Sequence, residues 1–528
     1  MNTTIYQIYP RSFYDSNGDG IGDLQGIIQK LEYIKNLGFE TIWISPFYSS
    51  PQADFGYDVS DYYQIAPEYG TLQDAEQLIT AVHQHGMKIV FDMVMNHTSD
   101  QHHWFLESKQ NTTNPKADWY IWRDKPNNWK SIVGPKAWHY CETRKQYYYA
   151  SFLPFQPDLN YRNPDVKKAM FDVCRYWLQK GVDGFRLDIF NCIYKDKDFK
   201  DNPFSLLHAF PSEDYPGGNF QIRKYSVNQE ENFLFAQELR QVVDTFQPPR
   251  LLVGEVFGKH TLKRKYLGNN DGLHLIFLFE MLFYHFNAAF FRKKILEFNH
   301  YYPFPLLPTT VFSNHDQFRS IRRVGNSLEK AKVLATLQFT MRGVPTVYAG
   351  EEIGMTNASI PIKEGKDPIT KTYSWVPQFI ANRLPVAINR DNCRTPMQWN
   401  TQANAGFSTN HQTWLPVNKD IENRNVEQQT ADDYSLLNTF KKLIALRKAI
   451  KAISAGDIEI VPTGNKHILA YTRSTSDEKV IVLINFSKAR IQNQLSVPIL
   501  ELLFSIHPKT TFNGILEAYD AVVCRIAN

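Results

Sequence analysis

The chain has 528 residues, of which 43% are hydrophobic and 21% are charged, and 58 Lys and Arg stand against 54 Asp and Glu. The net charge of +4 is small for this length, and no run of five Lys or Arg occurs, so we do not expect a nucleic-acid-binding protein. The length predicts several domains, although one α/β barrel can take up about 250 residues.

Short apolar runs rich in β-branched and aromatic residues alternate with helical segments. Amphipathic stretches at 23–38 and 71–86 each end at a glycine suited to a helix C-terminus. Seven runs are nearly continuous in apolar residues, as buried parallel strands are: 4–10, 39–47, 88–96, 184–190, 251–256, 308–316 and 343–351. The alternation predicts an α/β fold, a closed (β/α)8 TIM barrel.

Two regions interrupt this alternation. Residues 97–163 are rich in Trp, Tyr, Asn and Pro and predict an irregular insertion after the third strand. After about residue 453, short β-rich runs alternate with turns, as in a small antiparallel sheet. We therefore expect three domains, which are a barrel at 1–96 and 164–452, an inserted B domain at 97–163 and a C-terminal β domain at 453–528.

The cysteines and the N-terminus indicate a cytoplasmic protein. The chain has five cysteines, an odd number, with no CxxC or Cys/His spacing typical of zinc sites. The first residues lack a basic stretch followed by an apolar segment, so we expect no signal peptide. The most apolar run, 275–291, contains Glu280 and His285 and is expected to lie in the core rather than in a membrane.

Polar side chains occur where several predicted strands end. In α/β barrels the chemistry gathers at these carboxyl ends. Each such residue alone is more simply explained as a cap or a salt bridge, but three carboxylates at one barrel mouth repel one another unless function requires them. The candidates in chain order are His97, Arg186, Asp188, Glu255, His315 and Asp316.

Four separated motifs now carry a resemblance to a known family. They are FDMVMNHTSD (91–100), GFRLDIF (184–190), VGEV (253–256) and FSNHDQ (312–317). Through them the chain resembles glycoside hydrolase family 13, the α-amylase family, and within it the exo-acting α-glucosidases and oligo-1,6-glucosidases. The resemblance implies a catalytic barrel with an inserted B domain and a C-terminal β domain. It also implies a monomer that acts on a small oligosaccharide and needs no catalytic cofactor.

The resemblance implies that Asp188 is the nucleophile, Glu255 the general acid/base and Asp316 a third carboxylate that binds and distorts the sugar. Retaining glycosidases need two carboxyl groups about 5–5.5 Å apart, one to attack and one to protonate the leaving oxygen. The acid needs a raised pKa to hold its proton near neutral pH. Arg186 lies two residues before Asp188 on one strand, points to the same side and would keep Asp188 charged.

Further residues are implied to bind the sugar. His97 and His315 would donate or accept hydrogen bonds at its hydroxyls, and Tyr57 would stack on its apolar face. Asp58 and Arg394 match a pair that holds the non-reducing end in these exo-enzymes, so we expect them to form an ion pair that closes the pocket. An ordinary surface bridge is the alternative for this pair.

A loop near the N-terminus resembles a calcium site. The stretch DSNGDGIGDLQG begins like an EF-hand loop, but its twelfth residue is Gly26 where an EF-hand has a bidentate Glu. The family resemblance implies a structural cation here, and we expect Ca²⁺, with Mg²⁺ as the alternative metal and a metal-free turn as the alternative structure. The expected ligands are Asp15, Asn17, Asp19, the carbonyl of Ile21 and Asp23.

The linkage preference rests on the residue after the nucleophile. In these relatives Val at that position accompanies α-1,6 cleavage, and Ala or Thr accompanies α-1,4 cleavage. Ile189 is closer to Val and favours α-1,6 bonds, whereas the segment 114–129 is similar to α-1,4-preferring α-glucosidases. Val256 and Phe257 replace the commoner residues after the acid. Phe152 and Phe155 either line the pocket or pack in the core.

Other functions stay open at this point. A transglycosylase or a sucrose isomerase would use the same three acids. A trehalose-6-phosphate hydrolase would need a basic cluster, which Arg319, Arg322 and Arg323 could supply unless they lie on a helix after the strand. A non-catalytic relative, such as a transporter heavy chain, usually loses the acids and carries a membrane span.

Overall fold

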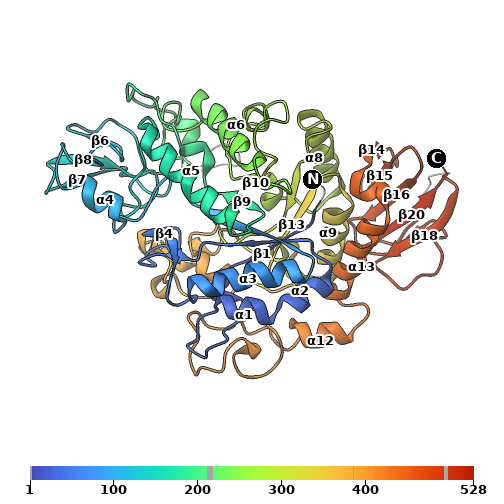
Figure 1. Cartoon of the computed structure of the whole chain (residues 1–528). Coiled ribbons are helices and arrows are strands. Elements are labelled where there is room, and N and C mark those ends of the chain that lie inside the picture. The colour runs from blue at the N-terminus through green and yellow to red at the C-terminus, as the bar shows by residue number, and fades with distance from the viewer. Residues whose placement is uncertain (1–2, 211–217, 385, 493–496, 528) are drawn as a thin grey trace.

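The computed structural model describes residues 3–210, 218–384, 386–492 and 497–527. Its centre is an eight-stranded parallel sheet in the order β11-β10-β9-β5-β2-β1-β13-β12, which curls into a nearly closed barrel (Figure 1). The predicted TIM barrel is confirmed. The strands are β1 (Ile5–Ile8), β2 (Thr41–Ile44), β5 (Lys88–Met93), β9 (Gly184–Leu187), β10 (Leu251–Gly254), β11 (Leu275–Ile276), β12 (Thr309–Val311) and β13 (Val344–Tyr348).

Each predicted strand contains an observed strand, and every observed strand is shorter. The sequence analysis missed β11, whose two residues open the apolar run 275–291 without a boundary that could separate strand from core. The gap between β11 and β12 is bridged by Thr309, whose hydroxyl donates to the carbonyl of Ile276 and accepts from the N–H of Leu278, at 2.9 and 3.0 Å. A side chain therefore closes the barrel where strand pairing stops.

Helices cover the outside of the barrel, and their termini follow from local sequence. Thr71 and Asp74 form a capping box at the start of α3, and Gly38 ends α2 with a φ of 97°. The expected helix at 23–38 is broken at Lys30 into two pieces. The helices are α1 (Leu24–Gln29), α2 (Leu31–Leu37), α3 (Leu72–Gln84), α5 (Pro164–Gln179), α6 (Glu230–Asp244), α7 (His260–Lys263), α8 (Ala288–Tyr301), α9 (Leu328–Thr340) and α13 (Leu436–Ala449).

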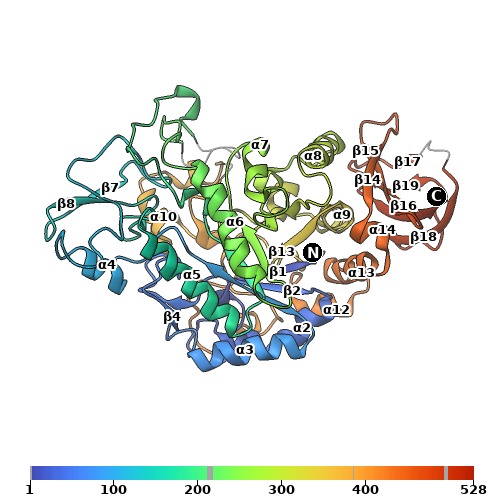
Figure 2. The same ribbon diagram turned by 45° about the horizontal axis from the view of Figure 1, so that its top comes forward.

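The insertion after β5 holds a small antiparallel sheet in the order β6-β8-β7. Isolated bridges from His97 to Asp158 and from Tyr120 to Leu159 close the segment at its base. Its elements are α4 (His103–Ser108), β6 (Trp122–Arg123), β7 (Trp138–Cys141) and β8 (Gln146–Tyr149). This sheet lies at the end of the molecule opposite the C-terminal sheet in both views (Figures 1 and 2).

The C-terminal region folds into a five-stranded antiparallel sheet in the order β14-β15-β16-β20-β18 and a two-stranded sheet. Both faces of its central strands are buried: Leu469 and Val482 join the main core, whereas Ile468, Leu483 and Val522 belong to a second cluster. The elements are α14 (Lys451–Ala455), β14 (Asp457–Val461), β15 (Ile468–Ser474), β16 (Lys479–Asn485), β17 (Ile491–Gln492), β18 (Ile499–Ser505), β19 (Ile515–Leu516) and β20 (Ala521–Ile526).

The segments outside these units are short. A two-stranded sheet follows β2, and small helices interrupt the long connection from β13 to α13. Across the described ranges no helix combines the length and the apolarity that a membrane crossing requires. The remaining elements are β3 (Tyr48–Ser49), β4 (Asp61–Ile65), α10 (Pro368–Thr372), α11 (Gln378–Ala381) and α12 (Val426–Ala431).

Candidate active site

One buried guanidinium joins three carboxylates at the carboxyl ends of β5, β9 and β10. Nη1 of Arg186 lies 2.8 Å from Oδ1 of Asp92 and 2.6 Å from Oδ1 of Asp188, and Nη2 contacts Oε2 of Glu255. Asp92 and Arg186 are register partners on adjacent strands, and the N–H of Glu255 bonds the carbonyl of Leu187. The barrel register therefore brings together residues far apart in sequence. We call these four side chains the Arg186 cluster.

Two carboxyl groups of the Arg186 cluster, those of Glu255 and Asp92, have raised pKa values. Burial raises the pKa of Glu255 to about 8, and Asp188 and Asp316 add to this against the charge of Arg186. Burial likewise raises the pKa of Asp92 to about 7, although Arg186, Trp43 and Tyr57 all bond its carboxylate. Glu255 thus keeps a proton near neutral pH, as a general acid must. Asp92 was not among the expected residues.

Asp316 lies in the opposite environment. Its Oδ1 accepts from Nη1 of Arg390 and from Nη2 of Arg394, each at 2.9 Å. Burial opposes its ionisation, but His315 and the two arginines outweigh burial and hold the pKa of Asp316 well below its usual range. Its side chain keeps 28% of its surface exposed, the most of any carboxylate discussed in this site. We call Asp316, Arg390 and Arg394 the Asp316 cluster.

A chain of close polar contacts links the two clusters. The hydroxyl of Tyr57 lies 3.1 Å from Oδ2 of Asp92 and 2.7 Å from Nε2 of His315, and that nitrogen lies 3.2 Å from Oδ2 of Asp316. The rings of Tyr57 and His315 are stacked with centroids 5.4 Å apart. Burial lowers the pKa of His315 to about 3, so the imidazole is neutral, and Gln7 bonds its other nitrogen.

The two histidines already have protein partners. His97 places Nε2 3.0 Å from the carbonyl oxygen of Tyr57 and Nδ1 3.2 Å from the amide of Asn96. His97 and His315 are almost fully buried. Their positions beside Tyr57 agree with the expected sugar site, but a bond to a sugar hydroxyl would have to share or replace one of these contacts. That role stays a prediction.

The expected ion pair between Asp58 and Arg394 is wrong. The carboxylate of Asp58 accepts from the hydroxyl of Ser50 and from the N–H groups of Ala53 and Asp54, so it caps the loop before Tyr57. Arg394 instead bonds Asp316 and the carbonyl of His315. Asp58 and Arg394 therefore bond different partners and do not bond each other.

Arg390 makes the cross-loop pair that was expected of Arg394. Its Nη2 lies 2.7 Å from Oδ1 of Asp54 and 2.7 Å from Oδ1 of Asp367, while Nη1 bonds Asp316. Desolvation opposes its charge, yet the three carboxylates raise the pKa of Arg390 well above its usual value. Asp54, Asp367 and Arg390 were missed. The motif DFGYD contains two aspartates and RDNCRT contains two arginines, so Asp54 and Arg390 stood beside the residues that were chosen.

Ile189 marks a sharp turn beside the nucleophile. The strand β9 ends at Leu187, and Ile189 has φ 34° and ψ 45°, a left-handed conformation that is rare for a β-branched residue. Strain of this kind persists only where the surroundings hold it, and it is common at functional sites.

An apolar cluster surrounds Ile189. Ile189, Cys192 and Val227 are buried together, and the partly buried side chains of Ile132, Phe152 and Phe257 pack against them. Phe152 also lies beside the ring of His97, with centroids 5.9 Å apart. Phe152 and Phe257 therefore reach the nucleophile side of the site, whereas Val256 is core and Phe155 shares neither contact.

The three arginines after β12 do not form one basic cluster. Arg322 and Arg323 lie in a 3₁₀ helix (Ser320–Val324), and Arg319 directly precedes it. Arg319 donates to the carbonyl of Ala349, Arg322 to the carbonyl of Asn382, and Arg323 lies over the ring of Phe283. The expected helix after this strand holds Arg322 and Arg323, and Arg319 lies just before it.

The N-terminal loop uses its acids as caps of the backbone. Asp15 accepts from the N–H groups of Asn17, Gly18 and Gly20, and Asp23 accepts from Ser16 and from the N–H of Gly26 at the start of α1. Asn17 and Asp19 each accept from the N–H two residues on. No group of three acidic, His or Cys side chains suited to a metal occurs among the described residues. This geometry fits the metal-free turn, and the calcium site stays a prediction.

Comparisons with known proteins place the chain. A model of the α-amylase catalytic domain matches residues 7–456. The chain belongs to the α-amylase family. A probable α-glucosidase of Rhizobium meliloti (strain 1021) is 39% identical over 94% of this chain and 91% of its own, and an oligo-1,6-glucosidase of Parageobacillus thermoglucosidasius is 38% identical over 95% and 93%. The crystal structure of the α-glucosyl transfer enzyme XgtA superposes with a TM-score of 0.90 at 35% identity and 99% coverage of both chains. The chain is a glycoside hydrolase of the α-glucosidase group.

Proposed function

We propose that the chain is a retaining α-glucosidase that removes terminal α-linked glucose from the non-reducing end of short oligosaccharides and prefers α-1,6 bonds. The observation that carries this proposal is the Arg186 guanidinium, whose two terminal nitrogens contact Asp188 and Glu255. The two carboxyl groups are therefore close neighbours, as the retaining mechanism needs.

In this mechanism Asp188 attacks the anomeric carbon while Glu255 donates its proton to the leaving glycosidic oxygen. Glu255 then takes a proton from water, which attacks the glycosyl-enzyme and releases glucose with its original anomeric configuration. Asp316 stays ionised between Arg390 and Arg394 and stabilises the distorted, positively polarised sugar ring. Water needs to enter only for the second step.

Closure of the site supports the exo mode of cleavage. Arg390 joins Asp54, which precedes Tyr57, to Asp367 in the connection after β13. Two loops from different parts of the chain thus meet beside Asp316. A site closed on this side accepts a chain end rather than the middle of a polymer. This assignment replaces Asp58 and Arg394 as the residues that hold the non-reducing end.

The preference for α-1,6 bonds rests on Ile189 and its apolar neighbours. Ile189 lies next to Asp188 in the chain, and its cluster packs against Phe257, which comes two residues after Glu255. A bulky wall there leaves less space for a rigid α-1,4-linked sugar, whereas an α-1,6 bond adds a rotatable torsion. The relatives include α-glucosidases and oligo-1,6-glucosidases, so their names do not decide between the two linkages.

Product analysis tests the proposal. The enzyme would be offered isomaltose, maltose, sucrose and trehalose 6-phosphate, and the first products would be followed by NMR. We expect isomaltose to release glucose at the highest rate. The anomer is read with 4-nitrophenyl α-glucoside, whose leaving group is not a sugar, and initial β-glucose from that substrate would contradict the retaining mechanism. Release of glucose 6-phosphate from trehalose 6-phosphate as the fastest reaction would contradict the substrate assignment.

Glucosyl transfer is the second candidate, because the apolar cluster around Ile189 would bind an acceptor with an apolar face better than it binds water. Solved relatives include an α-glucosyl transfer enzyme and a mutant of MutB in complex with the substrate sucrose. The same product analysis, repeated at high sugar concentration, measures transfer. Each cleavage of isomaltose frees one glucose as the leaving group, so transfer is measured against the glucosyl units that pass to water. More glucosyl units transferred to sugar than to water would make transferase the better description.

A further inference from the structure

Two adjacent glutamates follow β13, and each accepts hydrogen bonds from hydroxyl groups. Glu352 accepts from the phenols of Tyr6 and Tyr33, both at 2.7 Å. Glu351 accepts from the hydroxyls of Ser313 and Ser320, both at 2.8 Å. Within the described ranges neither carboxylate forms an ion pair with Lys, Arg or His. Carboxylates satisfied in this way are costly to bury and call for an explanation.

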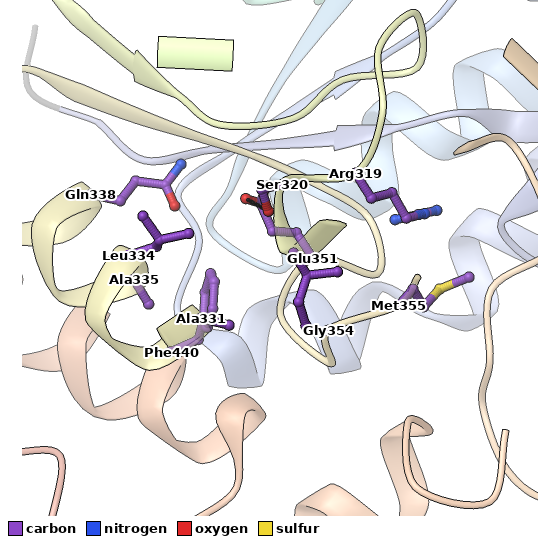
Figure 3. Close-up of a pocket in the computed structure, with 11 residues that line it drawn as sticks. Arg319, Ser320, Ala331, Leu334, Ala335, Gln338, Glu351, Gly354, Met355 and Phe440 are labelled. Carbon is purple, nitrogen blue, oxygen red and sulfur yellow. Dashed lines mark hydrogen bonds between the residues drawn. The ribbon is translucent and has the colours of Figure 1, made fainter. Parts of the chain in front are cut away.

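The two serines stand at the two ends of the segment that carries His315 and Asp316. Ser313 lies shortly after β12, and Ser320 begins the following 3₁₀ helix. The oxygens of one carboxylate therefore hold both ends of this segment. Figure 3 shows Glu351 next to Ser320, at a small cavity that Gln338 and Phe440 also line.

The middle of the same segment is held by the Asp316 cluster and its neighbours. Arg394 donates to the carbonyl of His315 at 2.7 Å, and the thiol of Cys393 lies 3.4 Å from the same oxygen. Arg390 and Arg394 draw the carboxylate of Asp316 towards the connection after β13. These contacts hold the middle of the segment, and Glu351 bonds a side chain at each of its two ends.

We propose that Glu351 is a positioning residue for Asp316, because it fixes both ends of the segment 313–320 and thereby sets where the third carboxylate stands relative to Asp188 and Glu255. The inference rests on the proposed function, in which Asp316 stabilises the distorted sugar. A carboxylate accepts two O–H donors at once, one on each oxygen. An amide offers one acceptor oxygen, so one of the two bonds would have to reverse, with the serine accepting from the N–H₂ group and its buried O–H left to find another acceptor.

The test is the variant Glu351→Gln, with Glu352→Gln as its matched control. We expect Glu351→Gln to lower kcat/KM for isomaltose about 10- to 100-fold, mainly in kcat, because the lost positioning matters most in the transition state. Glu352→Gln removes the same charge one residue away and should lower Tm without a comparable loss of kcat. An unchanged kcat/KM in Glu351→Gln, or an equal loss of kcat in Glu352→Gln, would overturn the proposal.

A double-mutant cycle separates positioning from general damage. In an Asp316→Asn background, Glu351→Gln should cost little more activity, because the group that it positions has already lost its charge. Fully additive losses would overturn the proposal. If Glu351→Gln does not fold, Ser313→Ala and Ser320→Ala each remove one bond and should each lower kcat about 3- to 10-fold, non-additively with Asp316→Asn. Wild-type kcat in both serine variants would then overturn it.

The proposed function is tested separately by Asp316→Asn alone. If that variant kept full activity, the role of Asp316 would be wrong, and the positioning role of Glu351 would be wrong with it. If Asp316→Asn were inactive while Glu351→Gln matched the wild type, only the positioning role would be wrong.

Discussion

The two halves of the site hold their carboxylates in opposite ways. In the Arg186 cluster three carboxyl groups share one guanidinium, and burial leaves Glu255 with a pKa of about 8. In the Asp316 cluster two guanidiniums bond one carboxylate oxygen and keep Asp316 ionised. The same side-chain chemistry thus supplies a proton donor in one half and a permanent charge in the other. The difference lies in how many arginines each carboxylate has.

The largest expected effect breaks the Arg186 cluster at its nucleophile. Asp188→Asn keeps the size of the side chain and removes its ability to form the glycosyl-enzyme, so turnover of isomaltose should fall by several orders of magnitude. Circular dichroism and thermal unfolding should show a folded protein. Near-normal turnover in the folded variant would contradict the assignment of Asp188.

The next prediction concerns the proton of Glu255. Because the general acid must be protonated, kcat/KM for isomaltose should be lost as the pH rises through about 8, approaching a tenfold fall per further pH unit. Glu255→Gln should remove this alkaline limb and lower the rate on isomaltose about 10²- to 10⁴-fold.

A substrate that needs no acid provides the control for Glu255. The 4-nitrophenolate ion leaves without a proton, so formation of the glycosyl-enzyme from 4-nitrophenyl α-glucoside should be much less affected in Glu255→Gln than the reaction of isomaltose. Pre-steady-state release of nitrophenol measures that step. Equal losses on the two substrates would show that Glu255 acts in some other way.

The Asp316 cluster is best tested by changing Asp54, which pairs with Arg390. Asp54→Asn leaves Arg390 with less compensation beside the sugar, and KM for isomaltose should rise about 10-fold or more, since removing one member of a buried charged pair typically costs 2–5 kcal/mol. Asp58→Asn is the matched control. It weakens a loop cap, so it should lower Tm and leave KM within about threefold of the wild type. The reverse outcome would restore the original assignment of Asp58.

The error over Asp58 shows where sequence reasoning stops. The motif DFGYD contains two aspartates, and RDNCRT contains two arginines, so composition and spacing leave four pairings open. Asp58 is taken by three donors of its own loop, and Arg394 by the carbonyl of His315. Which arginine crosses to which aspartate depends on how two distant loops pack. No local pattern encodes that choice.

The barrel strands show the complementary case. Apolar β-rich runs locate seven of the eight strands, and the strand ends locate Arg186, Asp188, Glu255 and His315 because parallel strands place their carboxyl ends together. Asp92 escaped notice although it lies in a predicted strand, since a buried acid inside an apolar run has no recognisable partner until the register is known. Strand β11 escaped because a two-residue strand has no period.

A smaller effect, on the choice between α-1,4 and α-1,6 bonds, is expected at Ile189 in the turn next to Asp188. Ile189 holds a left-handed conformation beside an apolar cluster, so Ile189→Thr or Ile189→Ala should open space for an α-1,4-linked sugar. The ratio of kcat/KM for maltose over isomaltose should rise roughly tenfold or more, because even one methylene in a pocket is worth about 1–3 kcal/mol. An unchanged ratio, or a wild type that already prefers maltose strongly, would refute the steric argument.

The smallest expected effect on activity concerns a third way of holding carboxylates, in the N-terminal loop. There backbone N–H groups satisfy Asp15 and Asp23. If the predicted Ca²⁺ binds this loop, it stabilises the native state by mass action, about 2.7 kcal/mol at a concentration 100 times its Kd. Chelation should then lower Tm and leave the pH–rate profile unchanged, and Asp19→Ala should abolish the Tm response to added Ca²⁺.

Asp19→Ala suits this test because Asp19 is exposed and, within the part of the chain that the structure describes, bonds only the N–H of Ile21. The variant therefore loses little that the metal-free loop needs. Asp15→Ala is a poorer choice, since it removes several backbone caps and would lower Tm with or without a metal. A wild type whose Tm does not respond to Ca²⁺ or Mg²⁺ would establish the metal-free turn. Immediate loss of activity on chelation, without unfolding, would instead give the metal a part in the chemistry that neither arginine cluster requires.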